Sequence, residues 1–589
     1  MAGANRDDDK RVTYFAATHT RGKREMFGIR AEDRGKHIYV IGKTGMGKST
    51  MLENMAIQDI QNGEGICFID PHGSTAEKLL DFVPQDRIKD VVYLAPFDTD
   101  HPMGFNVMED VGYDKRHLVV SGLMGAFRRI WVDAWSARME YILQNTLLAL
   151  LEYPGSTLLD VNRMLTNKSF RAAVVEKITD PIVKSFWTEE FAAFTDSYTR
   201  EATPAIQNKV GQFTANPLIR NIVGQAQSSF DLRKIMDEKK IFIVNLSKGR
   251  MGETNASLLG SMLVVKIYLA AMSRADEPAA VMAKLPRCYF YVDEFQSMMN
   301  EAFADILSES RKYKLALTLA NQYIEQMEEE VRDAVFGNVG TLIVFRVGPF
   351  DAEVLETVFD PTFTPEDLVG LGIGQIYLTL MIDGVGSKPF SAETIPPIEK
   401  PNISYRNDVV QSSRDQYGRV RADVEAAVNK RQFEFAMPPK KDKPAGEKRD
   451  YSRPRSDGGN DRARSDYTPR DEGRAPREVL MRRDTTTTTT TTTTTPAAPA
   501  RVPEEVQRNA LRAALAAVQA QPQAPAPATP VQRSPADILR EKMKGKQATG
   551  PTPQPQAARP APTSTVPPPP VRKSNEVSRE ELERVLRGN

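Results

Sequence analysis

A glycine-rich segment, residues 42–49, constrains the fold of this chain more than any other feature. A strand-like apolar run at residues 37–41 precedes it, and a helix-like stretch at residues 49–61 follows it. A loop that binds nucleotide phosphates requires this order of strand, glycine turn and helix. A chance match to the glycine pattern is the alternative, but it leaves the flanking strand and helix unexplained. The segment therefore predicts an α/β domain that binds a nucleotide.

The residue types in this loop suggest individual roles. Glycines let backbone N–H groups converge on phosphates, and the following helix presents its positive end to them. Lys48 is expected to reach the β- and γ-phosphates of ATP, and the Ser49 hydroxyl to coordinate Mg²⁺. The predicted nucleotide contacts are Gly42, Lys43, Thr44, Gly45, Met46, Gly47, Lys48, Ser49 and Thr50.

Short apolar runs recur along the first two thirds of the chain, and most of them are separated by helix-like stretches. Each run is apolar on both faces, which is typical of strands covered on both sides in a parallel sheet. The alternation predicts an α/β core with a mostly parallel central sheet. The runs are residues 38–41, 65–69, 91–94, 241–246, 289–292, 315–319 and 342–345.

The composition changes along the chain and divides it into four segments. Residues 1–107 and 228–401 are predicted to form the two parts of one nucleotide-binding domain. Residues 108–227 show helical periodicity, with four leucines on one face, and we expect an inserted all-helical subdomain. Residues 402–589 are rich in Pro, Ala, Thr and Gln, so we expect a disordered tail.

The predicted tail contains two notable features. An unbroken threonine run extends over residues 485–495, which is typical of low-complexity sequence. Near the end, Ser578 and Glu581 have capping-box spacing before Leu582, Val585 and Leu586. The pattern predicts either a short docking helix over residues 578–587 or plain coil.

Charge and cysteine content narrow the setting. The net charge is +1 across 589 residues, so any contact with DNA must come from a local basic surface. The two cysteines, Cys67 and Cys288, lie in apolar runs and favour a reducing cytosol. No signal peptide is evident, and the apolar stretch at residues 258–272 contains Lys266 and is shorter than a membrane span. We expect a cytoplasmic protein, with any membrane association made through a partner.

Two adjacent carboxylates end the strand-like run at residues 289–292. Asp293 is expected to hold Mg²⁺, and Glu294 to polarise the water that attacks the γ-phosphate. The alternative is an ordinary surface turn after a strand, although the phosphate loop upstream argues against it. This pair predicts a nucleotide hydrolase rather than a passive nucleotide binder.

Polar residues also follow the next two strands. Gln322 is predicted to sense the γ-phosphate or to orient the water, the alternative being that it and Asn321 cap a helix. Arg346 is predicted to act across a subunit boundary, with Arg311 as the second candidate, although a structural salt bridge explains either arginine. The turn at residues 70–73 is either ligand-binding or an ordinary turn.

Together these motifs resemble one family, the HerA and FtsK type of pumping ATPases. Within it, the chain is similar to soluble relatives of the TraG/TraD coupling proteins of type IV secretion. The resemblance covers residues 12–397 and implies a P-loop NTPase fold of RecA/FtsK type, with the phosphate loop as Walker A and the acidic pair as Walker B. It rests on residues 37–50, 69–73, 292–295, 307–313, 321–322 and 345–348.

The resemblance implies a homo-hexameric ring that uses ATP and Mg²⁺ to move DNA. It also implies delivery of that DNA to a type IV secretion or conjugation apparatus, with channel proteins or a relaxase as partners. Membrane-bound coupling proteins begin with transmembrane helices, and we expect none here, so a partner would recruit the motor to the inner face of the membrane. The alternatives are an ATPase that energises assembly or protein export without DNA, and a nucleotide-dependent scaffold or switch.

Overall fold

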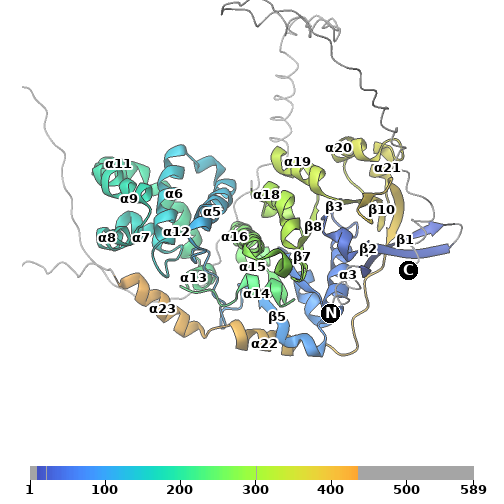
Figure 1. The fold of residues 1–589 in the computed structure, drawn as a ribbon, viewed down its shortest axis with the longest axis horizontal. Helices are drawn as coiled ribbons and strands as arrows, with labels where there is room; N and C mark the ends of the chain where they lie inside the picture. Colours follow the sequence, from blue (N-terminus) through green and yellow to red (C-terminus); the bar gives the residue numbers. More distant parts are fainter. Residues whose placement is uncertain (1–9, 21–22, 300–301, 435–589) are drawn as a thin grey trace, which may run out of the picture. The chain divides into compact units, whose positions relative to one another are not determined.

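We analysed a computed structural model of the chain, which describes residues 10–20, 23–299 and 302–434. Within this part an eleven-stranded sheet runs in the order β2-β1-β13-β10-β9-β3-β8-β7-β4-β6-β5 (Figure 1). The predictions for the threonine run and for a helix at residues 578–587 lie outside the described residues.

Seven neighbouring strands of this sheet are parallel. They coincide with the seven apolar runs found in the sequence, which confirms the prediction that these runs form a parallel sheet. All their residues are buried except Tyr93, which is half-buried. Because the strands are parallel, their carboxyl ends and the loops that follow them lie along one edge of the sheet. The parallel strands are β3 (Ile38–Ile41), β4 (Gly65–Asp70), β5 (Val91–Leu94), β6 (Ile241–Asn245), β7 (Cys288–Val292), β8 (Leu315–Asn321) and β9 (Thr341–Val344).

Four antiparallel strands, which the sequence analysis did not predict, extend the sheet beyond β9. They are β1 (Val12–Thr20), β2 (Lys23–Arg30), β10 (Gln375–Thr379) and β13 (Phe390–Thr394). In β10 exposed or half-buried residues alternate with buried ones, and the first four residues of β2 are exposed. Such strands lack the continuous apolar run that identified the others. A separate hairpin pairs β11 (Met381–Ile382) with β12 (Val385–Gly386).

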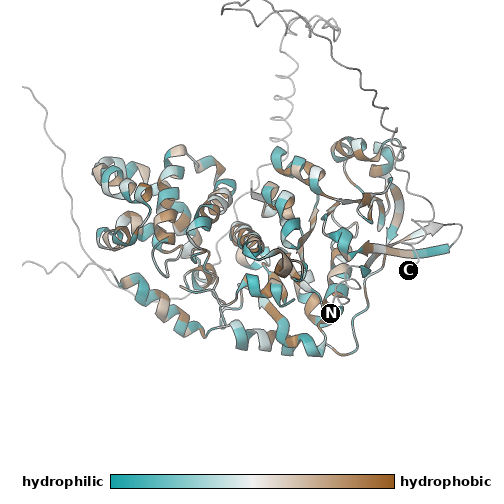
Figure 2. Cartoon of the chain, in the orientation of Figure 1, coloured by the Kyte–Doolittle hydropathy of each residue, from teal (hydrophilic) through white to brown (hydrophobic). Residues whose placement is uncertain are grey.

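Helices and turns occupy the chain between β5 and β6 (Figure 1). Several of these helices have a polar and an apolar side, which Figure 2 shows as alternating teal and brown. The exact boundaries of a helical subdomain remain a prediction. The longer helices are α5 (Arg116–Ile130), α6 (Ala137–Leu151), α7 (Asp160–Thr166), α8 (Lys168–Lys177), α11 (Asp196–Ala202), α12 (Pro204–Ala215), α13 (Pro217–Val223) and α14 (Leu232–Asp237).

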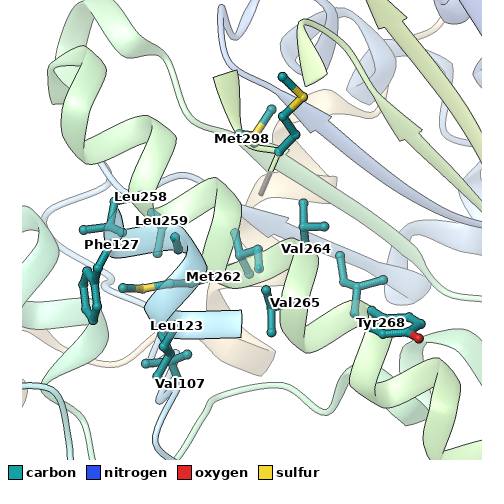
Figure 3. Packing of buried hydrophobic residues seen from close by; sticks show 14 of the residues in the cluster. Val107, Leu123, Phe127, Leu258, Leu259, Met262, Val264, Val265, Tyr268 and Met298 are labelled. Carbon is teal, nitrogen blue, oxygen red and sulfur yellow. The ribbon is translucent and has the colours of Figure 1, made fainter. Parts of the chain in front are cut away.

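Helix α16 (Glu253–Met272) is the central helix of the larger hydrophobic core. Figure 3 shows Leu258, Met262 and Val265 of α16 close to Leu123 and Phe127 of α5. Among the described residues, only the helical segment Glu253–Asp276 is long and apolar enough to cross a membrane, and 72% of its most apolar window is buried inside the fold. The expectation that this stretch is too short for a span is therefore wrong by length, but its burial fits a core helix.

A buried ion pair connects the helix that follows the phosphate loop to the central sheet. Arg34 donates to both oxygens of Asp59 on α3 (Lys48–Gln61), at 2.7 and 2.9 Å, and to the Tyr291 hydroxyl at 2.6 Å. The guanidinium also lies 3.6 Å from the ring centroid of Tyr289. Both members of the pair are at most 2% exposed. The pair thus fixes α3 against β7.

The prediction of a disordered tail from residue 402 is wrong for its first part. Helix α22 (Arg406–Tyr417) covers the edge strand β5, where the Ser413 hydroxyl accepts from the backbone N–H of Tyr93 at 2.9 Å. Helix α23 (Arg421–Phe433) packs against α13, with Val424 and Val428 buried. Their low apolar content hides them in the sequence, because each buries only two residues.

Candidate nucleotide-binding site

The phosphate loop has a backbone that glycine makes possible. Gly42, Gly45 and Gly47 have φ angles of 156°, 78° and 115°, in the range that favours glycine. A Cβ atom on Gly42 would lie 2.5 Å from the Phe345 Cβ, so the loop also packs closely on the chain after β9. The backbone N–H of Lys43 donates to the Arg346 carbonyl at 2.8 Å. These contacts hold the loop open above the start of α3.

Lys48 is the first residue of α3 and points back into the loop. Its ammonium group donates to the carbonyl of Gly42 and, at 3.2 Å, to that of Lys43. The side chain is buried, and this burial lowers its pKa, while the carboxylates of Glu294 and Asp293 act in the opposite direction. A buried cation facing two carboxylates is suited to bind a triphosphate.

Ser49 and Asp293 meet at the start of α3. The Ser49 hydroxyl donates to Asp293 Oδ2 at 2.8 Å, so two oxygen groups of the kind that Mg²⁺ prefers lie side by side. Asp293 is only 4% exposed, and burial raises its pKa, as do the nearby carboxylates of Glu294 and Asp70. A bound cation would relieve this repulsion, so the residues present fit a magnesium ion.

Glu294 is at the centre of a polar network that spans three strands. Its backbone is left-handed, with φ 49°. One carboxylate oxygen accepts from Gln322 at 2.6 Å and the other accepts from Gln296. The Gln322 carbonyl oxygen in turn accepts from the Thr44 hydroxyl of the phosphate loop at 2.9 Å. The structure therefore brings the predicted water-activating acid, the predicted sensor and the loop together.

Two alternatives from the sequence can now be compared with the geometry. The Asn321 side chain bonds to the Tyr39 hydroxyl at 2.6 Å and to the Tyr323 carbonyl at 3.0 Å, and Gln322 bonds to Thr44 and Glu294, so neither amide caps a helix. The Asp70 carboxylate accepts from the backbone N–H of His72 in its own turn at 2.8 Å and from that of Ala76 in the following helix α4 (Ser74–Leu79) at 2.9 Å. Asp70 thus stabilises a turn.

The two candidate arginines lie at opposite edges of the sheet. Arg346 follows β9, and its carbonyl contacts the phosphate loop of its own chain. Arg311 is exposed and precedes β8, whereas Gln322 follows the same strand. The seven residues of β8 separate them by roughly 20 Å, at about 3.3 Å per residue. Arg311 therefore lies at the sheet edge opposite the nucleotide site of its own chain.

Sequence reasoning missed two contributors to the site. Gln296 donates to Glu294, and its position two residues after the acidic pair was the available signal. The backbone N–H of Gly374 donates to the Met46 carbonyl at 3.0 Å, which places the loop before β10 against the phosphate loop. The signal in the sequence for that contact was the glycine itself, which has φ 77° in the structure.

Comparison with known proteins identifies one protein family. A family model described as "Type IV secretion-system coupling protein DNA-binding domain" matches residues 27–357. No curated protein matches the chain.

The solved structures that match the chain include plasmid coupling protein TrwB in complex with ADP and Mg²⁺, at 15% identity and TM-score 0.48, covering 64% of this chain and 90% of that one. TrwB in complex with the GTP analogue GDPNP has 17% identity and TM-score 0.46, covering 64% and 88%. VirB4 of Thermoanaerobacter pseudethanolicus has 13% identity and TM-score 0.43, covering 67% and 98%. The parallel sheet and the phosphate loop between β3 and α3 confirm the P-loop NTPase fold class.

Proposed function

The chain belongs to the family of type IV secretion-system coupling proteins, and we propose that it is an ATP-driven motor that moves DNA toward a secretion or conjugation apparatus. The observation that carries the proposal is the meeting of Lys48, Ser49, Asp293 and Glu294 around one loop. In the simplest arrangement the motor is cytoplasmic, and a channel protein or a relaxase recruits it.

In this proposal the residues of the phosphate loop bind the nucleotide, and the acidic pair holds the metal ion and activates water. Lys48 holds the β- and γ-phosphates of ATP, and Ser49 and Asp293 hold Mg²⁺. When bound, Mg²⁺ would neutralise the negative charge that develops on the phosphates during hydrolysis. Glu294 takes a proton from the attacking water, while Gln322 positions that water and links it to Thr44. Lys48 and Asp293 are buried, and this burial strengthens their electrostatic interactions.

We further propose a homo-hexameric ring in which an arginine from one subunit completes the site of the next. Arg311 suits this role better than Arg346, because Arg311 is exposed at the sheet edge opposite its own phosphate loop. Arg346 lies beside its own loop, where it can contact the phosphates of its own subunit. The role predicted for Arg346 in a neighbouring site therefore passes to Arg311.

Hydrolysis of ATP measured with and without DNA tests the proposal, together with the mass of the assembly in the presence of nucleotide. A DNA motor predicts turnover that DNA stimulates and a nucleotide-dependent ring. An ATPase for assembly or protein export predicts turnover that DNA leaves unchanged. A scaffold or switch predicts a single slow turnover, with product released only when a partner binds.

A further inference from the structure

The two turns that follow β4 and β6 are hydrogen-bonded to each other at the carboxyl edge of the sheet. We call residues 70–73 and 246–252 the paired turns, the second of which includes the short helix α15 (Lys248–Met251). The backbone N–H of Leu246 donates to the Asp70 carbonyl at 3.0 Å, and that of Lys248 donates to the Pro71 carbonyl at 2.8 Å. Gly73 has φ 91°, and a Cβ atom there would lie 2.3 Å from the Ser247 hydroxyl. The paired turns are therefore a rigid surface.

This surface carries cations without matching anions. His72, Gly249 and Arg250 are exposed and Lys248 is half-buried. Within the described part of the chain, no carboxylate forms an ion pair with Lys248 or Arg250. The Arg250 guanidinium lies 4.4 Å from the ring centroid of Phe97, which orients it at the surface.

Of the acidic side chains near the paired turns, Asp70, Asp98 and Glu77 are already engaged, whereas Glu253, the residue after the second turn, is exposed and forms no ion pair with Lys248 or Arg250. Asp70 uses one carboxylate oxygen for a backbone N–H group of its own turn and the other for one of the following helix α4. Asp98 accepts from Arg414 at 2.7 Å, and Glu77 accepts from Arg406 at 3.3 Å. The charge of Lys248 and Arg250 is therefore available to an anionic ligand from outside the chain.

The paired turns are too far from the phosphate loop to serve the same nucleotide. In the sheet, β6 is four strands from β3, with β8, β7 and β4 between them. At about 4.8 Å per strand this is roughly 19 Å, measured along the same edge of the sheet. The cations therefore face a ligand other than the triphosphate of their own subunit.

We propose that the paired turns bind the phosphate backbone of a DNA strand through Lys248 and Arg250. Lysine and arginine contacts to phosphates position a protein on DNA without reading its sequence, which suits a motor that moves along any sequence. Gly249 lies between the two cations in the sequence of α15, and a Cβ atom there meets no atom within 4 Å, so a strand can approach this short helix closely. This inference rests on the proposed motor function and specifies where its DNA lies.

The first test compares the wild type with Lys248→Ala/Arg250→Ala, using full-length protein and fluorescently labelled single-stranded and duplex oligonucleotides. Basal ATP hydrolysis should stay unchanged, whereas stimulation by DNA should be lost. Loss of two phosphate contacts should reduce the slope of log K against log salt by about 1.4 for single strands or 1.8 for duplex. Lys168→Ala/Arg200→Ala, an exposed lysine and an exposed arginine on α8 and α11, is the matched control and should behave as the wild type.

A second pair of variants leaves both cations in place. Gly249→Glu adds a carboxylate between them and should abolish stimulation by DNA, whereas Gly249→Gln adds the same volume without charge and should retain most of it. Equal stimulation in the wild type and in both charge variants overturns this inference while the motor proposal stands. Loss of basal hydrolysis in Gly249→Glu also overturns it, because the turn then serves nucleotide turnover. A wild type that DNA neither binds nor stimulates contradicts the motor proposal itself.

Discussion

Replacing Glu294 by glutamine should separate nucleotide binding from turnover. Glutamine keeps the side-chain length and one acceptor oxygen, so one of the two hydrogen bonds from Gln322 and Gln296 survives. The lost hydrogen bond costs about 1 kcal/mol of stability. Loss of the general base should lower kcat by about 10²–10⁴-fold, which corresponds to roughly 2.7–5.5 kcal/mol in the activation free energy.

The assay pairs phosphate release with binding of a fluorescent ATP analogue. Affinity should stay the same or increase, because Lys48, Ser49 and Asp293 are unchanged and the Glu294 charge no longer raises the pKa of Asp293. Glu329→Gln is the control, since the Glu329 side chain is 84% exposed on α19 (Glu329–Asn338). A variant that loses less than about tenfold in kcat, below the range of general-base catalysis, would refute the role given to Glu294.

Three further predictions follow from the same structure. Arg34→Met leaves the buried charge of Asp59 without its ion-pair partner and should lower the free energy of unfolding, measured in urea, by about 3–5 kcal/mol. The double variant Arg34→Met/Asp59→Leu should recover most of this loss. Equal losses in both variants would contradict the ion-pair explanation. The folded-state pKa of Asp293 is raised, so the folded state binds the proton more tightly than the unfolded state, and the nucleotide-free protein should gain stability as the pH falls through that pKa. Over the same pH range the Mg²⁺-dependent affinity for nucleotide should fall. Asp293→Asn should flatten both pH profiles. A mixture of Lys48→Ala and Arg311→Ala subunits should hydrolyse more ATP than either variant alone, and a mixture that does not contradicts action of Arg311 between subunits.

The sequence revealed the part of the fold that is buried on both faces. Strands such as β4 and β7 consist almost wholly of apolar residues, so they stand out without any knowledge of their neighbours. Strands β2 and β10 form the antiparallel extension, and their buried positions depend on which face meets the core. Helix α22 was missed for a related reason, because a half-polar helix over an edge strand needs few apolar residues. Tertiary packing decides these elements.

Within the site, the sequence could identify polar residues that directly follow a strand, but it could not identify which residues they contact. Gln322 was found because it follows β8, and its bonds to Thr44 and Glu294 join residues that are 278 and 28 positions apart. Gly374 contacts Met46 only because β10 returns beside β9. Arg346 and Arg311 differ in exposure and in sheet edge, and neither property can be read from the chain without the strand order.

The strand order also explains how one sheet edge can serve two ligands. The predicted catalytic pair follows β7 and the paired turns follow β4 and β6, and because β4 is the immediate neighbour of β7, the turn that begins at Asp70 lies next to the pair. The Asp70 carboxylate contributes to the raised pKa of Asp293, and the Asp70 carbonyl accepts the Leu246 N–H of the second turn. A strand pulling on Lys248 or Arg250 acts on a turn that is bonded to β4, the immediate neighbour of β7. Because those turns are rigid, such a displacement reaches the strand that carries Asp293 instead of being absorbed in a loop, which gives the proposed motor a short mechanical path between DNA and ATP.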